Sequence, residues 1–319
     1  MTRQMNRRQF NKVLGLSALA LGANHVGLEG LAQKTVGPQI SITMDDFFWQ
    51  NAIHQTAMQR NQAILGALKS HSIKAAMFVI GRNVETDEGK QLLAEWNKAG
   101  HLIGNHTYSH QNFNSPSMTL QNYQEDTLRA EAILKSFSRF QKYFRFPMLK
   151  EGDTVEKRDG FRTFLKKHDY RVGHVTIDSA DWAITPRLES RLKANSSAEV
   201  NPYREFYLAH MWDRAQYYDA LARRVLGRPV RHALLVHFNL LNGLFMNDLI
   251  EMFKSKGWQF VDAEDAFTDP VFALKPNVLP AGESIIWALA KADGKIAKSL
   301  KYPAEDGDDV VEQMKKLGL

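Results

Sequence analysis

The chain has 319 residues, 44% of them hydrophobic, which is enough for one large α/β domain with a full core. Its net charge is +6, and residues 1–32 carry +3 of this, so the remainder lacks the strong basic excess typical of nucleic-acid-binding proteins. The chain contains no cysteine, which excludes disulfide bonds and thiolate metal ligands.

The first predicted segment is an export signal in residues 1–32. Arg7 and Arg8 precede an apolar run at 13–23 that is shorter than the ~20 residues a membrane span needs. A basic start followed by a short apolar run is typical of a signal peptide, and the arginine pair with its flanking residues resembles a twin-arginine signal. We therefore expect an exported protein, periplasmic or secreted, with no stable membrane span after cleavage and with the twin-arginine export machinery as a partner. The alternative is a basic amphipathic first helix of a cytosolic protein.

Apolar, β-branched runs alternate with helical patterns along the rest of the chain. Strands are predicted at 39–44, 74–80, 102–104, 143–146, 172–177, 233–238 and 258–261. Helices are predicted at 56–71, 88–99, 120–140, 160–168 and 244–256. This alternation favours βαβ units and a parallel sheet. A mostly helical insertion at 183–232 and a C-terminal extension at 265–319 interrupt the pattern, and both are expected to belong to the same domain.

The most informative side chains follow the predicted strands. Three residues separate His106 from His110, so both imidazoles can reach one point, from a helical turn or from a tight loop. Asp45 and Asp46 end the first strand, and adjacent carboxylates seldom have a purely structural role there because like charges repel. Two histidines and one aspartate form a ligand set for a catalytic divalent metal, most simply Zn²⁺, with a position left for water. Co²⁺ and Ni²⁺ would fit the same set.

Five segments of the chain carry a family resemblance. They occur in this order: 40–46, 100–110, 145–147, 178–182 and 234–237. Together they resemble the five motifs of the polysaccharide deacetylases, the NodB-like carbohydrate esterases of family 4 (CE4). The resemblance implies a NodB homology domain over residues 33–319, with the fold of an irregular (β/α)7 barrel, a distorted relative of the TIM barrel.

The resemblance also implies a role for each matching residue in catalysis. Asp45 would act as the general base, while the metal would be held by Asp46, His106 and His110. Arg145 would pair with the base and keep it ionised.

On the other side of the site, His237 would act as the general acid, oriented by Asp181. The resemblance implies substrate contacts as well. Leu234 would line the pocket for the acetyl methyl group, and the backbone N–H of Met148 would stabilise the oxyanion. Trp182, the last residue of the fourth motif, would contact the substrate.

The chain departs from the family pattern next to the acidic pair. Phe47, Phe48 and Trp49 stand where the family has Gly-Pro. The large rings at these positions, Trp49 among them, would either stack on a sugar ring or pack the barrel mouth, and both interpretations stay open. Met148 replaces an aromatic residue that is often found after the third-motif proline. These changes leave the identity of the substrate more open than the type of reaction.

The leading functional hypothesis is a hydrolase of carbon–nitrogen amide bonds that removes acetyl groups from an acetylated glycan outside the cytoplasm. N-acetylated polysaccharides or oligosaccharides are the expected substrates, and O-acetyl esters would need the same residues. One alternative is a NodB-like hydrolase of a non-sugar amide or cyclic imide. Another is a catalytically inactive, carbohydrate-binding relative. A nucleic-acid partner is not expected.

Overall fold

The computed structural model describes residues 37–301 and 307–319. The predicted export signal at 1–32 lies outside these residues. Within them, no helix is both long and apolar enough to cross a membrane.

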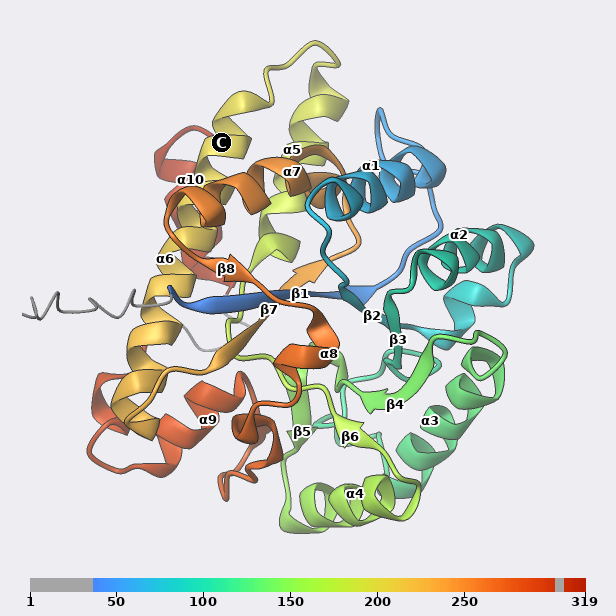
Figure 1. Ribbon diagram of the computed structural model, residues 1–319, viewed down its shortest axis with the longest axis vertical. Coiled ribbons are helices and arrows are strands. Elements are labelled where there is room, and N and C mark those ends of the chain that lie inside the picture. The colour runs from blue at the N-terminus through green and yellow to red at the C-terminus, as the bar shows by residue number, and fades with distance from the viewer. Residues whose placement is uncertain (1–36, 302–306) are drawn as a thin grey trace, which may run out of the picture. The chain divides into compact units, whose positions relative to one another are not determined.

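Among the described residues, seven strands form one parallel sheet around a central strand, β1 (Figure 1). Its order is β6-β4-β3-β2-β1-β7, and β8 pairs with the first residues of β1. The strands of this sheet are β1 (Gln39–Asp46), β2 (Ala76–Val79), β3 (Leu102–Asn105), β4 (Phe140–Phe144), β6 (Arg171–Val172), β7 (Arg231–His237) and β8 (Gln259–Phe260). A separate antiparallel pair, β5 (Lys150–Gly152) with β9 (Ala281–Gly282), ties the C-terminal extension to the loop after the third motif.

One segment, 171–177, joins the two edges of the sheet. Its first two residues form β6 and pair with β4, while Ile177 pairs with Leu234 of β7. The sheet therefore curls back on itself, and the predicted irregular (β/α)7 barrel is confirmed. The predicted strand at 172–177 is interrupted at Gly173, where a Cβ atom would lie 2.3 Å from the Phe78 ring.

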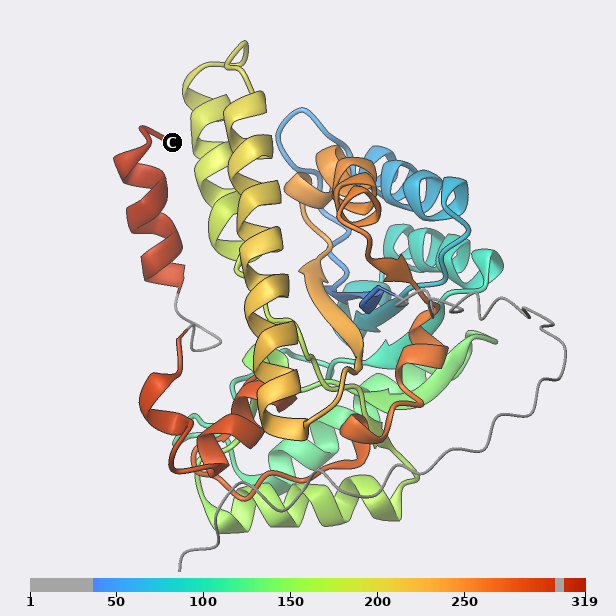
Figure 2. The same ribbon diagram turned by 60° about the vertical axis from the view of Figure 1, so that its left-hand side comes forward.

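Helices surround the sheet (Figures 1 and 2). The helices are α1 (Ala57–Ser70), α2 (Asp87–Ala99), α3 (Leu120–Leu134), α4 (Val155–Lys167), α5 (Asp181–Ala194), α6 (Asn201–Leu226), α7 (Leu240–Ser255), α8 (Ala263–Ala266), α9 (Ile285–Ala292) and α10 (Gly307–Lys316). Short 3-10 turns are η1 (Gly81–Val84), η2 (Pro147–Leu149), η3 (Pro270–Ala273) and η4 (Ala297–Ser299). Within the predicted insertion, α5 and α6 run side by side, and the extension packs on them through α10 and α9 (Figure 2).

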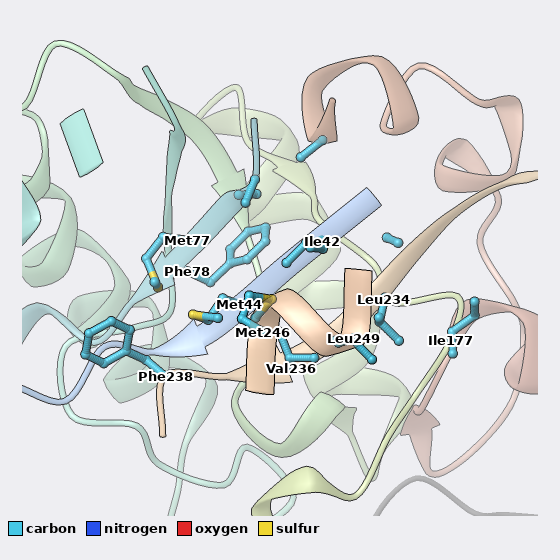
Figure 3. Packing of buried hydrophobic residues seen from close by; sticks show 14 of the residues in the cluster. Ile42, Met44, Met77, Phe78, Ile177, Leu234, Val236, Phe238, Met246 and Leu249 are labelled. Carbon is cyan, nitrogen blue, oxygen red and sulfur yellow. The ribbon is translucent and has the colours of Figure 1, made fainter. Parts of the chain in front are cut away.

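One face of β1 and β7 packs against a helix, and the other face lines the barrel interior. Side chains alternate across a strand, and in-register neighbours on parallel strands share a face. Ile42 and Met44 lie opposite Leu234 and Val236 and pack under α7 (Figure 3). The alternate residues of both strands point the other way, toward the barrel interior.

Several predicted helix boundaries were wrong. Helix α3 ends at Leu134 rather than at residue 140, because Phe140 already begins β4. Helix α4 begins five residues before the predicted start, where the Thr154 hydroxyl accepts a hydrogen bond from the Lys157 N–H and so caps the helix.

Candidate active site

The residues predicted as metal ligands lie at the carboxyl ends of β1 and β3. Asp46 is the last residue of β1, and His106 and His110 follow β3, which ends at Asn105. Strand β2 lies between β1 and β3 and pairs with both. Because these strands are parallel, their carboxyl ends meet at one end of the barrel, where barrel enzymes build their active sites.

The three ligand side chains converge on one point. His110 Nε2 lies 3.2 Å and His106 Nε2 lies 3.6 Å from Asp46 Oδ1. The potential ligand atoms of the three residues all lie within 4.8 Å of one another. Asp46 Oδ1 is buried and has no hydrogen-bond partner among the described residues. A divalent cation would satisfy such a buried oxygen facing two imidazole nitrogens, so the residues fit the predicted metal.

Neighbouring groups set the orientation and charge of these ligands. His106 Nδ1 donates a hydrogen bond to the backbone carbonyl of Arg145 (2.9 Å), which leaves Nε2 as the nitrogen facing Asp46. Burial alone would raise the pKa of Asp46, but the close His106 and His110 imidazoles, together with the His237 charge, outweigh it and hold that pKa well below its usual value. The Asp46 carboxyl is therefore ionised, as a metal ligand must be.

The histidines are carried by a tight loop rather than by a helical turn. Thr107 and His110 have φ values of 62° and 57°, in the left-handed region. Asn105 Oδ1 accepts a hydrogen bond from the Thr107 N–H (2.8 Å), and Thr107 Oγ1 accepts one from the His110 N–H (3.0 Å). Asp126 Oδ2 accepts from the N–H groups of residues 108 and 109. These side-chain acceptors hold the loop in the conformation that aims both rings at Asp46.

Asp45 and Arg145 form a buried ion pair inside the barrel, with exposed fractions of 2% and 1%. Arg145 Nη1 donates to Asp45 Oδ1 (2.8 Å) and to Thr43 Oγ1 (2.9 Å), and its Nε donates to the carbonyl of Gly173 (2.8 Å). The other Asp45 oxygen, Oδ2, lies 3.7 Å from His106 Nε2. One oxygen of Asp45 is thus held by the guanidinium, while the other faces the ligand set.

His237 ends β7 in register with Asp45 and pairs with Asp181 at the start of α5. Asp181 Oδ1 lies 2.7 Å from His237 Nδ1, and its Oδ2 accepts hydrogen bonds from the His237 N–H (2.8 Å) and from Asn242 Nδ2 (2.7 Å). Burial lowers the pKa of His237, but the Asp181 carboxylate, with Asp46 and Asp45, raises it to about 10. The imidazole is therefore protonated at neutral pH and has a proton to give.

A pocket of about 440 Å³ opens over these groups. Its lining residues are Asp45, Asp46, His106, His110, Met148, Leu149, Asp178, Trp182, Leu235 and His237. The predicted substrate contacts Met148 and Trp182 lie in its wall and are 43% and 41% exposed. Asp178, the first residue of the fourth motif, received no predicted role. Burial raises the pKa of Asp178 well above its usual value, and the Glu283 charge adds to this effect.

The structure corrects the prediction for Leu234. Leu235, not Leu234, lines the pocket, and Leu234 is fully buried in the helix-facing core (Figure 3). The reason is strand alternation, since Leu235 is two residues before His237 and so shares its face. Sequence periodicity counted back from His237 identifies the correct residue.

The structure also places Trp49 away from the ligand pocket. Asp46 and Phe47 have φ values of 80° and 58°, so the chain turns sharply after β1 instead of continuing the strand. Phe47 is buried against Phe238, with ring centroids 4.9 Å apart, and Trp49 packs against the core and lines a separate hollow. Within this segment Phe48 is the side chain exposed next to the site, while Trp49 packs as in the alternative interpretation.

Comparison with known proteins gives a consistent result. A family model described as polysaccharide deacetylase matches residues 32–172. Two curated relatives from Bacillus cereus, both named peptidoglycan-N-acetylglucosamine deacetylase, are 29% and 30% identical over 120 and 122 residues. Each match covers 37% of this chain, and the chain spans only 40% and 41% of the relatives' lengths.

Solved structures give the same fold. The chain resembles a CE4 family pseudoenzyme from Bacillus anthracis with a TM-score of 0.50 and 16% identity, over 72% of this chain and 65% of that one. A mutant of a CE4 family pseudoenzyme matches with the same TM-score and identity, over 72% of this chain and 67% of the other. At this identity the likeness concerns the fold alone. The family model and the relatives show that the N-terminal part of the chain, residues 32–172, is similar to polysaccharide deacetylases, and the solved structures show a similar fold.

Proposed function

We propose that the chain is a metal-dependent hydrolase that removes acetyl groups from an acetylated glycan. The observation that carries this proposal is the set of Asp46, His106 and His110, whose ligand atoms lie within 4.8 Å of one another in the floor of a pocket. The ion-paired Asp45 and the protonated His237 line the same pocket. A base, an acid and a ligand set in one pocket are what amide hydrolysis by activated water requires.

Asp46, His106 and His110 would hold the metal, with zinc favoured by the ligand types and cobalt or nickel as alternatives. When bound, a divalent ion supplies Lewis-acid polarisation of the acetyl carbonyl and lowers the pKa of water from 15.7 towards ~7.

The proton transfers belong to the chain's own residues. Asp45 accepts the proton of the attacking water through the oxygen that Arg145 leaves open. His237 donates its proton to the departing nitrogen as the carbon–nitrogen bond breaks, so that acetate and a free amine result. Asp181 keeps the His237 ring oriented for this step.

The pocket wall supplies the contacts to the acetyl group. Leu235 would pack against the methyl group, and the N–H of Met148 would donate to the carbonyl oxygen as it gains charge. Trp182 would flank the sugar ring. The fold itself does not decide between an active enzyme and an inactive relative, since a CE4 pseudoenzyme shares it. The complete set of charged groups favours activity.

The proposal extends to the whole chain. Residues 33–319 would form the single NodB-like domain, with the insertion at 183–232 and the extension at 265–319 as parts of it. Residues 1–32 would direct export by the twin-arginine route, so that the enzyme meets its glycan in the periplasm or outside the cell.

Acetate release from a panel of substrates tests this function. The zinc-loaded full chain is expected to release acetate from N-acetylglucosamine oligomers or peptidoglycan, or from O-acetylated xylan if esters are preferred. Release from none of these, together with ring opening of a cyclic imide such as hydantoin, would overturn the glycan assignment in favour of a non-sugar amide.

A further inference from the structure

Helix α6, which lies within the insertion at 183–232, packs against both α5 and α7. Helix α5 begins at Asp181, and α7 follows the strand that ends at His237. Tyr207 and His210 of α6 are three residues apart and therefore lie on the same face of the helix. Both side chains are buried, and buried polar groups need hydrogen-bond partners. The partners of these two side chains adjoin Asp181.

The Tyr207 hydroxyl bonds the amide that holds the Asp181 carboxylate. It donates to Asn242 Oδ1 (2.6 Å), and Asn242 Nδ2 donates to Asp181 Oδ2 (2.7 Å). Because the hydroxyl takes the amide oxygen, the NH₂ group of Asn242 is left to face the carboxylate. All three side chains are fully buried, which strengthens these bonds. Burial, together with the Asp181 charge, raises the pKa of Tyr207 well above its usual value, so the hydroxyl remains a donor.

The His210 ring bonds the backbone directly before Asp181. Its Nε2 accepts a hydrogen bond from the Ala180 N–H (3.2 Å). Ala180 is the N-cap residue of α5 and has no side chain that could cap the helix, so this contact from α6 fixes the start of α5. Burial and the Arg214 charge outweigh the Asp181 charge and lower the pKa of His210 to about 3. The ring is therefore neutral at neutral pH, and Nε2 keeps the lone pair that accepts the bond.

These contacts act on the geometry of proton donation. Asp181 Oδ1 lies 2.7 Å from His237 Nδ1, and this contact sets the direction in which the imidazole points its other nitrogen. Helix α6 constrains Asp181 twice, through its carboxylate and through the backbone that precedes it. A displacement of a catalytic group by about 1 Å can lower a rate by about 10²-fold, so supports of this kind affect turnover.

We propose that Tyr207 and His210 are positioning residues, which act on the catalytic acid by holding Asp181 in place. The insertion at 183–232 thereby contributes to catalysis, although neither residue lines the pocket over the ligand set. This inference rests on the proposed function, because it takes His237 to be the proton donor.

The leaving group provides a test that separates positioning of the acid from general stability. The nitrogen of an amide must be protonated as it departs, whereas 4-nitrophenolate leaves as an anion and needs no proton. In the zinc-loaded full chain, Tyr207→Phe should lower kcat for the N-acetylglucosamine tetramer by about tenfold and leave its KM unchanged. Hydrolysis of 4-nitrophenyl acetate by the same variant should keep its wild-type kinetics.

The matched control is Tyr203→Phe, because Tyr203 is also buried on α6 but has no hydrogen bond to Asn242 or Ala180 within the described residues. It should change neither reaction. Melting temperature and bound zinc check that each variant is folded and loaded. An equal loss of both reactions in Tyr207→Phe would show a purely structural role and overturn the proposal, and so would an unchanged kcat for the tetramer.

His210 is tested by the pair His210→Leu and His210→Gln. Leucine removes the acceptor for the Ala180 N–H, while the glutamine side-chain oxygen can take the place of Nε2. His210→Leu should lower kcat for the tetramer without affecting 4-nitrophenyl acetate hydrolysis, and His210→Gln should restore it. Equal kinetics of the two variants would overturn the role of His210.

A spectroscopic measurement separates this inference from the proposed function. In protein with ¹⁵N-labelled histidine, the Nδ1–H signal of His237 is assigned by its loss in His237→Gln. Exchange of this proton with water should be about tenfold faster in Tyr207→Phe and unchanged in Tyr203→Phe, because a looser Asp181 shields the proton less. Faster exchange in a protein that releases no acetate would support the positioning role while overturning the deacetylase assignment. Acetate release together with unchanged exchange would overturn the positioning role and leave the function standing.

Discussion

Asp181 Oδ1 lies 2.7 Å from His237 Nδ1, and the same carboxylate bonds the backbone N–H of that histidine through its second oxygen. This contact joins the first residue of α5 to the last residue of β7. The helix that leads into the insertion therefore fixes a predicted catalytic group. Asn242 of α7 bonds the same carboxylate and prevents it from turning away.

Replacing Asp181 by Asn should shift the pH dependence of turnover. His237 can donate only while it is protonated, so activity falls as pH rises through its pKa, which the Asp181 carboxylate helps to raise to about 10. Without that charge the pKa falls, and the alkaline limb of the kcat/KM profile should move to lower pH by about one unit or more. An alkaline limb that stays in place in Asp181→Asn would show that His237 is not the titrating acid.

Replacing Asp45 by Asn should separate metal binding from turnover. The ligands Asp46, His106 and His110 are unchanged, and the asparagine oxygen can still accept from Arg145, so zinc content should stay near one ion per chain. Loss of the base should lower kcat by about 10²–10⁴-fold.

His110→Ala is the paired variant, because it removes one ligand while leaving the base in place. It should lose both zinc and activity, measured by elemental analysis and acetate release. Near-normal turnover of Asp45→Asn would mean that another group takes the proton.

The pair Leu234→Ala and Leu235→Ala tests which leucine faces the substrate. Leu234 is fully buried in the core under α7, so truncation should lower the free energy of unfolding by about 2–5 kcal/mol. Leu235 lines the pocket, so Leu235→Ala should lower kcat/KM for acetyl substrates. It should also narrow the preference for acetyl over bulkier acyl groups. Urea unfolding and acyl-chain kinetics measure the two effects, and the reverse assignment of these effects would refute the pocket geometry.

The convergence of the three predicted ligands could be anticipated from the sequence because these residues stand next to strand ends. Asp46, His106 and His110 follow parallel strands, and the topology alone brings such positions to one end of the barrel. His237 and Asp181 lie 56 residues apart in the chain, and only the family resemblance pairs them before the fold is known.

Other parts of the site depend on backbone details that the sequence does not reveal. Because Asp46 and Phe47 adopt left-handed conformations, Phe48 rather than Trp49 lies next to Asp46 and His237. Both residues are non-glycine, so no composition signal marks the turn. Arg60 is similar, because nothing in its helical neighbourhood indicates that it supports a loop 10 and 12 residues earlier.

Metal removal tests whether acetate release depends on an ion held by Asp46, His106 and His110. Acetate release by the full chain from the N-acetylglucosamine tetramer is measured as purified, after chelation, and after zinc is returned. Chelation is expected to abolish release, and about one zinc ion per chain, bound by Asp46, His106 and His110, is expected to restore it. Undiminished release by the metal-free protein would contradict metal-dependent hydrolysis, and a zinc-loaded protein that releases no acetate would contradict deacetylation.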